Sequence, residues 1–158
     1  MVEGFYEDLE QARAAETIVC DKLSSLAPGI KFENVGNDRQ YFHKGDIKAT
    51  LESGKEVFVE VKDDSCIHRT RNVLCEEEVY FNYNGVTTPG NMYSDYEIYC
   101  VLSQKERKMY LIDFDILRKN YKKGEYKEIQ HQAQTTYCYL CSLAQIKKWG
   151  AMIKVIKY

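Results

Sequence analysis

The chain has 158 residues, a length that suits one domain and allows about two thirds of the unfolded surface to be buried without disulfides. Hydrophobic residues make up 44% and charged residues 29%, which is ordinary for a globular protein, and the net charge is −2. This balance excludes a protein whose whole surface attracts nucleic acid or membranes, so a site for a polyanion has to be local. We predict a single domain over residues 1–158.

The N-terminal segment MVEGFYEDLE has neither a basic start nor a long apolar run, which predicts that there is no signal peptide. Apolar runs stay far below the ~20 residues that a membrane-spanning helix needs. We therefore expect a cytoplasmic protein without membrane contact, whose six cysteines are reduced thiols.

Residues 5–26 are predicted to form one helix with a single buried stripe. The members of the stripe recur at spacings of three and four residues, which is the period of one helix face. They are Phe5, Leu9, Ala12, Glu16, Val19, Leu23 and Leu26. Pro28 and Gly29 end the helix. Glu16 is the exception in this pattern, because a carboxylate occupies a position assigned to the core.

The rest of the chain predicts a succession of strands and then short helices. Strands are expected within 30–42, in a hairpin of 45–51 and 55–62, and at 72–81, 94–103, 108–113, 136–141 and 151–158. Segments 82–91 and 121–134 are expected to be irregular. Asp113 can cap a short helix, and Ser142 with Gln145 forms a capping box for another. This order predicts an α+β or mixed α/β fold with one central sheet flanked by helices.

The hairpin carries charged side chains on a strand that is otherwise apolar. A three-residue loop at 52–54, closed by a left-handed glycine, brings Asp46 opposite Glu60. A two-residue loop would instead set Asp46 against Val61 and move it to the other face. The apolar alternation selects the three-residue loop, which leaves Asp46, Glu60 and Lys62 on one face.

Two carboxylates directly opposite each other, with side chains ~5 Å apart, destabilise a sheet unless a cation joins them. A salt bridge between Glu60 and Lys62 is the simplest structural explanation, but it leaves Asp46 and Glu16 unexplained. A hard cation such as Mg²⁺, which binds carboxylate, carbonyl and water oxygens at ~2.1 Å, accounts for more of them. Asp46, Glu60 and the main-chain carbonyl of Val61 could supply such a set, and Mn²⁺ can substitute.

The segments GDI at 45–47 and VEVK at 59–62 resemble the catalytic core of the PD-(D/E)XK nuclease superfamily. The resemblance spans residues 5–62 and implies a restriction-endonuclease-like fold with a central mixed sheet flanked by helices. Gly45 stands where the namesake motif has proline. A looser likeness to small phage-type nucleases covers 69–78 and 90–102, where Ser94 replaces an alanine.

The resemblance implies a hydrolase of phosphodiester bonds that depends on Mg²⁺ and acts on DNA by default. Asp46 and Glu60 match the two acids of the motif, Lys62 matches its lysine, and Glu16 matches the glutamate that the N-terminal helix often contributes. A homodimer is compatible with this assignment. The sequence leaves open a non-catalytic nucleic-acid-binding module of the same fold, and it does not separate DNA from RNA or endonuclease from exonuclease.

Basic side chains near the hairpin and in the run 118–127 are candidates for phosphate contacts, although a solvated face explains the run equally well. Those assigned to nucleic acid are Lys44, Lys48, Arg69, Arg71, Arg118 and Lys119. Aromatic residues between 80 and 99 could stack on bases, although most are expected in the core. They are Tyr80, Phe81, Tyr83, Tyr93, Tyr96 and Tyr99. Glu76 is either an accessory acid or one of three surface acids.

A rival interpretation is a structural zinc site. Cys138 and Cys141 form a CxxC that Cys66 and His68 could complete. The CxxC lies in an expected strand with apolar neighbours, which favours buried free thiols.

Overall fold

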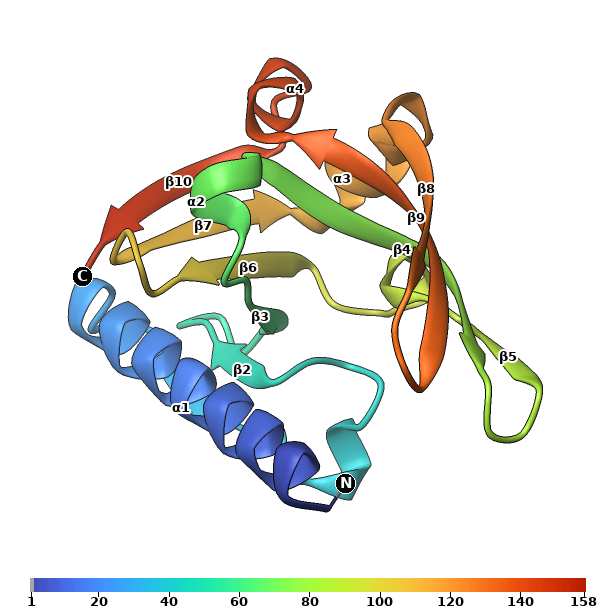
Figure 1. The fold of residues 1–158 in the computed structure, drawn as a ribbon. Coiled ribbons are helices and arrows are strands. Elements are labelled where there is room, and N and C mark those ends of the chain that lie inside the picture. Colours follow the sequence, from blue (N-terminus) through green and yellow to red (C-terminus); the bar gives the residue numbers. More distant parts are fainter. Residues whose placement is uncertain (1) are drawn as a thin grey trace.

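The computed structural model describes residues 2–158, and side chains from residue 7 onward. It confirms an α+β protein in which helices flank a mixed central sheet (Figure 1). A second sheet, which the sequence did not predict, lies on the face of the central sheet opposite the long N-terminal helix.

The central sheet has six strands in the order β1-β2-β3-β6-β7-β10. Their bounds are β1 (Lys31–Asn34), β2 (Ile47–Thr50), β3 (Glu56–Asp63), β6 (Ile98–Ser103), β7 (Lys108–Asp113) and β10 (Met152–Lys157). Strands β3 and β6 pair in parallel, and every other neighbouring pair is antiparallel. The sheet is therefore mixed, as expected.

The second sheet has four strands in the order β5-β4-β9-β8. Their bounds are β4 (Asn72–Phe81), β5 (Val86–Pro89), β8 (Glu125–Gln130) and β9 (Gln134–Ser142). Figure 1 shows the far ends of β4, β5 and β9 extending away from the central sheet. The prediction that segments 82–91 and 121–134 are irregular was wrong in part, because the first contains β5 and the second contains β8.

Helix α1 (Val2–Leu26) forms as expected and packs on β1 and β3. Of the described members of the predicted stripe, only Val19 and Leu23 are buried against the sheet, together with Ala15, which the stripe did not include, and Glu16 is half-buried. The prediction of burial was wrong for Leu9, Ala12 and Leu26, which are exposed. Phe5 lies outside the residues whose side chains are described. The first half of α1 overhangs the sheet and borders a cavity described below.

The remaining helices are short. They are α2 (Ile67–Thr70), α3 (Phe114–Asn120) and α4 (Leu143–Lys148), with 3-10 turns η1 (Arg39–Tyr41), η2 (Asn91–Tyr93) and η3 (Tyr121–Lys123). Both predicted caps are confirmed: Asp113 accepts a hydrogen bond from the Ile116 N–H, and Ser142 forms a capping box with Gln145.

Two cores hold the layers together. One lies between α1 and the central sheet, and the other lies between the two sheets. Tyr96 and Tyr99 belong to the second core and expose only 1% and 2% of their surface, so they cannot stack on bases. Tyr83 and Tyr93 are exposed, by 79% and 57%, and remain candidates.

No helix within the described residues is both long and apolar enough to cross a membrane. The six cysteines are all free, as expected for reduced thiols. Cys141 is buried and its Sγ lies 3.6 Å from the Sγ of Cys75.

Candidate metal and catalytic site

The hairpin of β2 and β3 has the predicted register. Ile47 pairs with Val59, and the Leu51 N–H donates to the Lys55 carbonyl at 2.9 Å. Gly54 has φ +83°, the left-handed conformation that closes the three-residue loop. The apolar alternation of the two strands therefore selected the correct turn.

Asp46 lies one residue before β2, where the strand pairing has ended. Its N–H donates to the Val59 carbonyl at 2.9 Å, and its Oδ2 accepts the Val61 N–H at 2.9 Å. The expected ladder pair of Asp46 with Glu60 is thus wrong in detail, because the last pair is Ile47 with Val59. A main-chain hydrogen bond, rather than strand pairing, holds the Asp46 carboxylate beside the strand that carries Glu60.

Gly45 allows the chain to turn at this point. It has φ +140°, and a Cβ built on it would lie 3.0 Å from the Val59 carbonyl oxygen. Proline, with φ near −65°, could not adopt this conformation. The departure from the namesake motif therefore has a local structural reason.

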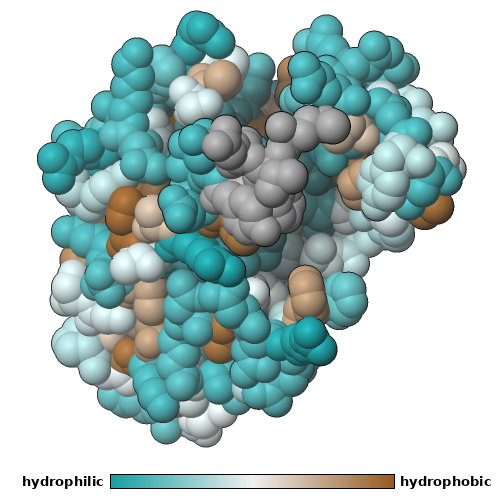
Figure 2. Space-filling view, turned by 60° about the horizontal axis from the view of Figure 1, so that its bottom comes forward, coloured by the Kyte–Doolittle hydropathy of each residue, from teal (hydrophilic) through white to brown (hydrophobic). Residues whose placement is uncertain are grey.

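One cavity of about 490 Å³ brings the predicted site residues together. It is lined by Asp8, Gln11, Ala12, Glu16, Asp46, Glu60, Val61, Lys62 and Asp63. The first half of α1 supplies one wall, and β3 with the approach to β2 supplies the other. Figure 2 shows that the described surface on this side of the molecule is largely hydrophilic.

Sequence reasoning missed two acids of the cavity, Asp8 and Asp63. Both had a signal. Asp8 lies eight residues before Glu16 on the same helix, so the two share a face. Asp63 directly follows Lys62 at the end of β3.

Burial and neighbouring carboxylates raise the pKa of Glu60 to about 8. Burial is the largest cause, and Asp46 and Glu16 are the next. Lys62 acts in the opposite direction. Glu60 therefore carries a proton near neutral pH unless a cation displaces it.

The other two acids are shifted in the same direction. Burial, and then the charge of Asp46, raises the pKa of Glu16. Burial also raises the pKa of Asp46, while the hydrogen bond from Val61 lowers it. The raised pKa of Glu16 therefore reflects in part the charge of Asp46, which lines the same cavity.

Lys62 is exposed at the mouth of the cavity. No ion pair joins Lys62 to Glu60 among the described residues. The salt-bridge explanation of the strand is therefore not supported, and the ammonium is available to an anion.

The donor set fits a hard cation in chemistry, because it consists of carboxylate oxygens and the Val61 carbonyl. Within the described part of the chain, however, no three His, Cys, Asp or Glu side chains lie close enough to form a metal-binding group. Side-chain rotation, most simply of Glu16 or Glu60, would have to complete the set. The same finding leaves the zinc interpretation without a ligand cluster.

Three of the basic candidates are already engaged with protein groups. Lys48 pairs with Glu33 and Glu56, and Arg118 binds Asp115. The third is Arg71.

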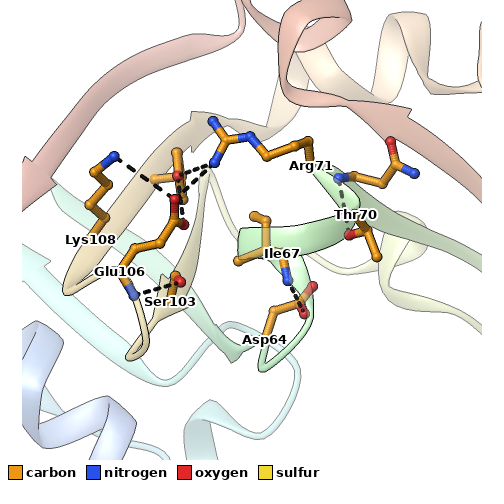
Figure 3. Close-up of polar contacts among 9 residues, drawn as sticks. Asp64, Ile67, Thr70, Arg71, Ser103, Glu106 and Lys108 are labelled. Carbon is orange, nitrogen blue, oxygen red and sulfur yellow. Dashed lines mark hydrogen bonds and ion pairs between the residues drawn. The ribbon is translucent and has the colours of Figure 1, made fainter.

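Figure 3 shows Arg71 reaching the turn between β6 and β7. Its guanidinium donates to Glu106 at 3.0 Å and to the Tyr110 hydroxyl at 3.1 Å. Lys44, Arg69 and Lys119 remain exposed.

Glu76 is half-buried on β4 rather than a surface acid. Its N–H donates to the side chain of Asn91 at 2.8 Å, and its charge adds to the raised pKa of Glu60. It does not line the cavity.

No protein-family model and no curated protein matches the chain. A solved structure of a bacterial homing endonuclease, I-Ssp6803I, is similar with a TM-score of 0.48 and 14% identity, over 79% of this chain and 74% of that chain. This likeness is remote, so the function has to be inferred from the residues of the cavity.

Proposed function

We propose that this chain is a metal-dependent nuclease that hydrolyses phosphodiester bonds, with DNA as the default substrate. The convergence of Glu16, Asp46, Glu60 and Lys62 on one cavity carries the proposal. The similarity of GDI and VEVK to the PD-(D/E)XK core supports it. Fold alone would not, because one fold hosts many functions.

The charge of the cavity explains why a cation is needed. Five carboxyl groups, of which Glu60 retains its proton near neutral pH, and one ammonium line it, namely Asp8, Glu16, Asp46, Glu60, Asp63 and Lys62. A phosphodiester anion would be repelled by this surface unless positive charge were added. When bound, Mg²⁺ would offset that charge and lower the pKa of a water molecule.

Asp46, Glu60 and the carbonyl of Val61 would hold the cation. The Val61 N–H orients the Asp46 carboxylate before any cation arrives. Glu60 has to release the proton that its raised pKa retains, so cation affinity increases with pH. Glu16 would reach the cation, or a water on it, from α1.

Lys62 would act on the reaction centre rather than on the cation. A charged ammonium has three donors and no acceptor, so it cannot ligate a metal. From the mouth of the cavity it would orient the attacking water and stabilise negative charge on the phosphate oxygens.

The absence of a preformed three-carboxylate group among the described residues favours a second candidate, a nucleic-acid-binding module without turnover. Incubation of supercoiled plasmid with the protein and Mg²⁺, with and without chelator, separates the two. A nuclease nicks or linearises the plasmid only without chelator, and Asp46→Asn loses this activity while Lys55→Ala, on the hairpin loop, keeps it. Binding of DNA or RNA without cleavage of either would favour the module.

A further inference from the structure

Phe42 exposes 76% of its surface, although phenylalanine is usually buried. It follows η1 and precedes Asp46 by four residues. Phe42 does not line the cavity itself, but its exposed ring stands four residues before a candidate cation ligand, and an exposed aromatic face can stack on a base.

The exposure is not the product of a loose turn. Asp38 accepts the Gln40 N–H at 3.1 Å and caps η1, and the ring of Tyr41 packs 5.7 Å from that of Phe58 in the core. The Lys44 N–H donates to the Tyr41 carbonyl at 2.9 Å. The segment is therefore fastened on both sides of the exposed ring.

The main chain at Phe42 lies close to Asp46. Four residues span at most about 14 Å, so the Cα atoms of Phe42 and Asp46 are no farther apart than this. Successive phosphates on a duplex strand advance 3.4 Å along the axis. Phe42 is therefore within a few nucleotides of a phosphate held at Asp46.

The neighbours of the ring fit a nucleotide. The imidazole of His43 lies 6.2 Å from the Phe42 ring, and the exposed Lys44, two residues on, holds its ammonium 5.5 Å from the ring of Phe58. An aromatic face matches a base, and an ammonium matches a phosphate. An exposed ring with a lysine nearby in the chain therefore favours a nucleotide as the ligand.

We infer that Phe42 stacks on an unpaired base beside the scissile phosphate, so that the substrate carries single-stranded nucleotides at the cleavage position. Base faces are covered by their neighbours in an intact duplex, and only an unstacked base offers its face to a ring. This inference rests on the proposed function and specifies its substrate class.

The test compares the affinity of the full chain for a labelled single-stranded oligonucleotide and for the same sequence in a duplex, by fluorescence anisotropy. Ca²⁺ replaces Mg²⁺, and probe integrity is checked on a gel. We expect Phe42→Ala to weaken single-strand binding by about 5- to 100-fold and duplex binding by less than about 2-fold. Phe42→Trp should retain single-strand binding, and Tyr126→Ala, which removes another exposed ring, should change neither affinity.

Unchanged single-strand binding in Phe42→Ala, or an equal loss on both probes, overturns the stacking inference. Plasmid cleavage by the wild type would then leave the nuclease proposal standing. A wild type that binds neither probe overturns the inference, and the plasmid assay decides the nuclease proposal separately. Conversion of a dimer to a monomer by Phe42→Ala, seen by light scattering, would make the ring a self-association contact and would also overturn it.

Discussion

The Val61 N–H donates a 2.9 Å hydrogen bond to Oδ2 of Asp46. The main chain of one strand thereby orients a carboxylate that belongs to the approach to its neighbour. Because this contact uses only one carboxylate oxygen, the other remains available to a cation.

Two substitutions of Asp46 can distinguish the contribution of its charge from that of its hydrogen bond to the Val61 N–H. Asp46→Asn keeps an oxygen that can accept the Val61 N–H but removes the charge, so we expect a folded protein that no longer binds Mn²⁺. Asp46→Ala also leaves the Val61 N–H without its partner, which costs about 1–3 kcal/mol where the group is buried. Calorimetry with Mn²⁺ and thermal unfolding of both variants check this; equal Mn²⁺ affinity of Asp46→Asn and wild type would contradict it.

Lys62→Ala should abolish cleavage while leaving the affinity for Mn²⁺ nearly intact. Loss of one charge-stabilising donor costs about 10²–10³ in rate. A plasmid-nicking assay measures the rate, and Lys55→Ala serves as the matched control on the same strand hairpin. Cleavage by Lys62→Ala at the wild-type rate would make the lysine structural and remove the nuclease assignment with it.

Stability of the metal-free protein should fall as pH rises. Glu60 has an ordinary pKa of 4.5 and a pKa of about 8 in the folded protein, and Glu16 and Asp46 are raised as well. Between pH 4.5 and about pH 8 the folded state therefore binds more protons than the unfolded state. The free energy of unfolding is then highest below pH 4.5, where Glu60 is protonated in both states, and it decreases as the pH rises towards about 8.

Urea unfolding across this pH range measures the effect. Glu60→Gln should flatten the pH dependence, because its amide does not titrate, and Mg²⁺ should restore wild-type stability at the alkaline end. A wild type whose stability rises with pH in parallel with Glu60→Gln would contradict the buried, protonated Glu60.

Gly36 offers a way to move Glu16 without replacing it. A Cβ on Gly36 would lie 2.9 Å from Oε2 of Glu16, the far end of a flexible side chain. Gly36→Ala should therefore displace the carboxylate, lower Mn²⁺ affinity by up to about 10-fold and barely change stability.

Gly54→Ala is the matched control. Gly54 has φ +83° and open space around it, so alanine costs about 1–2 kcal/mol of stability through backbone strain alone. Its Mn²⁺ affinity should stay unchanged. If Gly36→Ala also binds Mn²⁺ like wild type, Glu16 does not contribute to the site.

Residues that act on their immediate chain neighbours, such as turn glycines and helix caps, allowed the sequence to predict the elements that they begin or close. Gly54 determined the hairpin loop, and the capping residues Asp113 and Ser142 determined where two helices begin. The cavity acids Glu16 and Glu60 were found because each is a carboxylate in an otherwise apolar pattern.

The features that the sequence predicted incorrectly depend on contacts between residues far apart in the chain. Strand β8 is almost wholly exposed, so it shows no apolar alternation, and β9 stabilises it by pairing. The burial of α1 is limited by where the sheet ends, which helix periodicity cannot reveal. The end of the β2 ladder at Ile47 follows from the close approach of Gly45 to Val59, a contact visible only in three dimensions.

Anomalous diffraction from a crystal soaked in Mn²⁺ tests the central claim most directly. We expect a peak in the cavity at about 2.1 Å from carboxylate oxygens of Asp46 and Glu60 and from the Val61 carbonyl, with the Lys62 ammonium beyond ligand distance. A cavity without a peak, or an ion held by none of these three groups, would contradict the assignment of this site to metal-dependent phosphodiester hydrolysis.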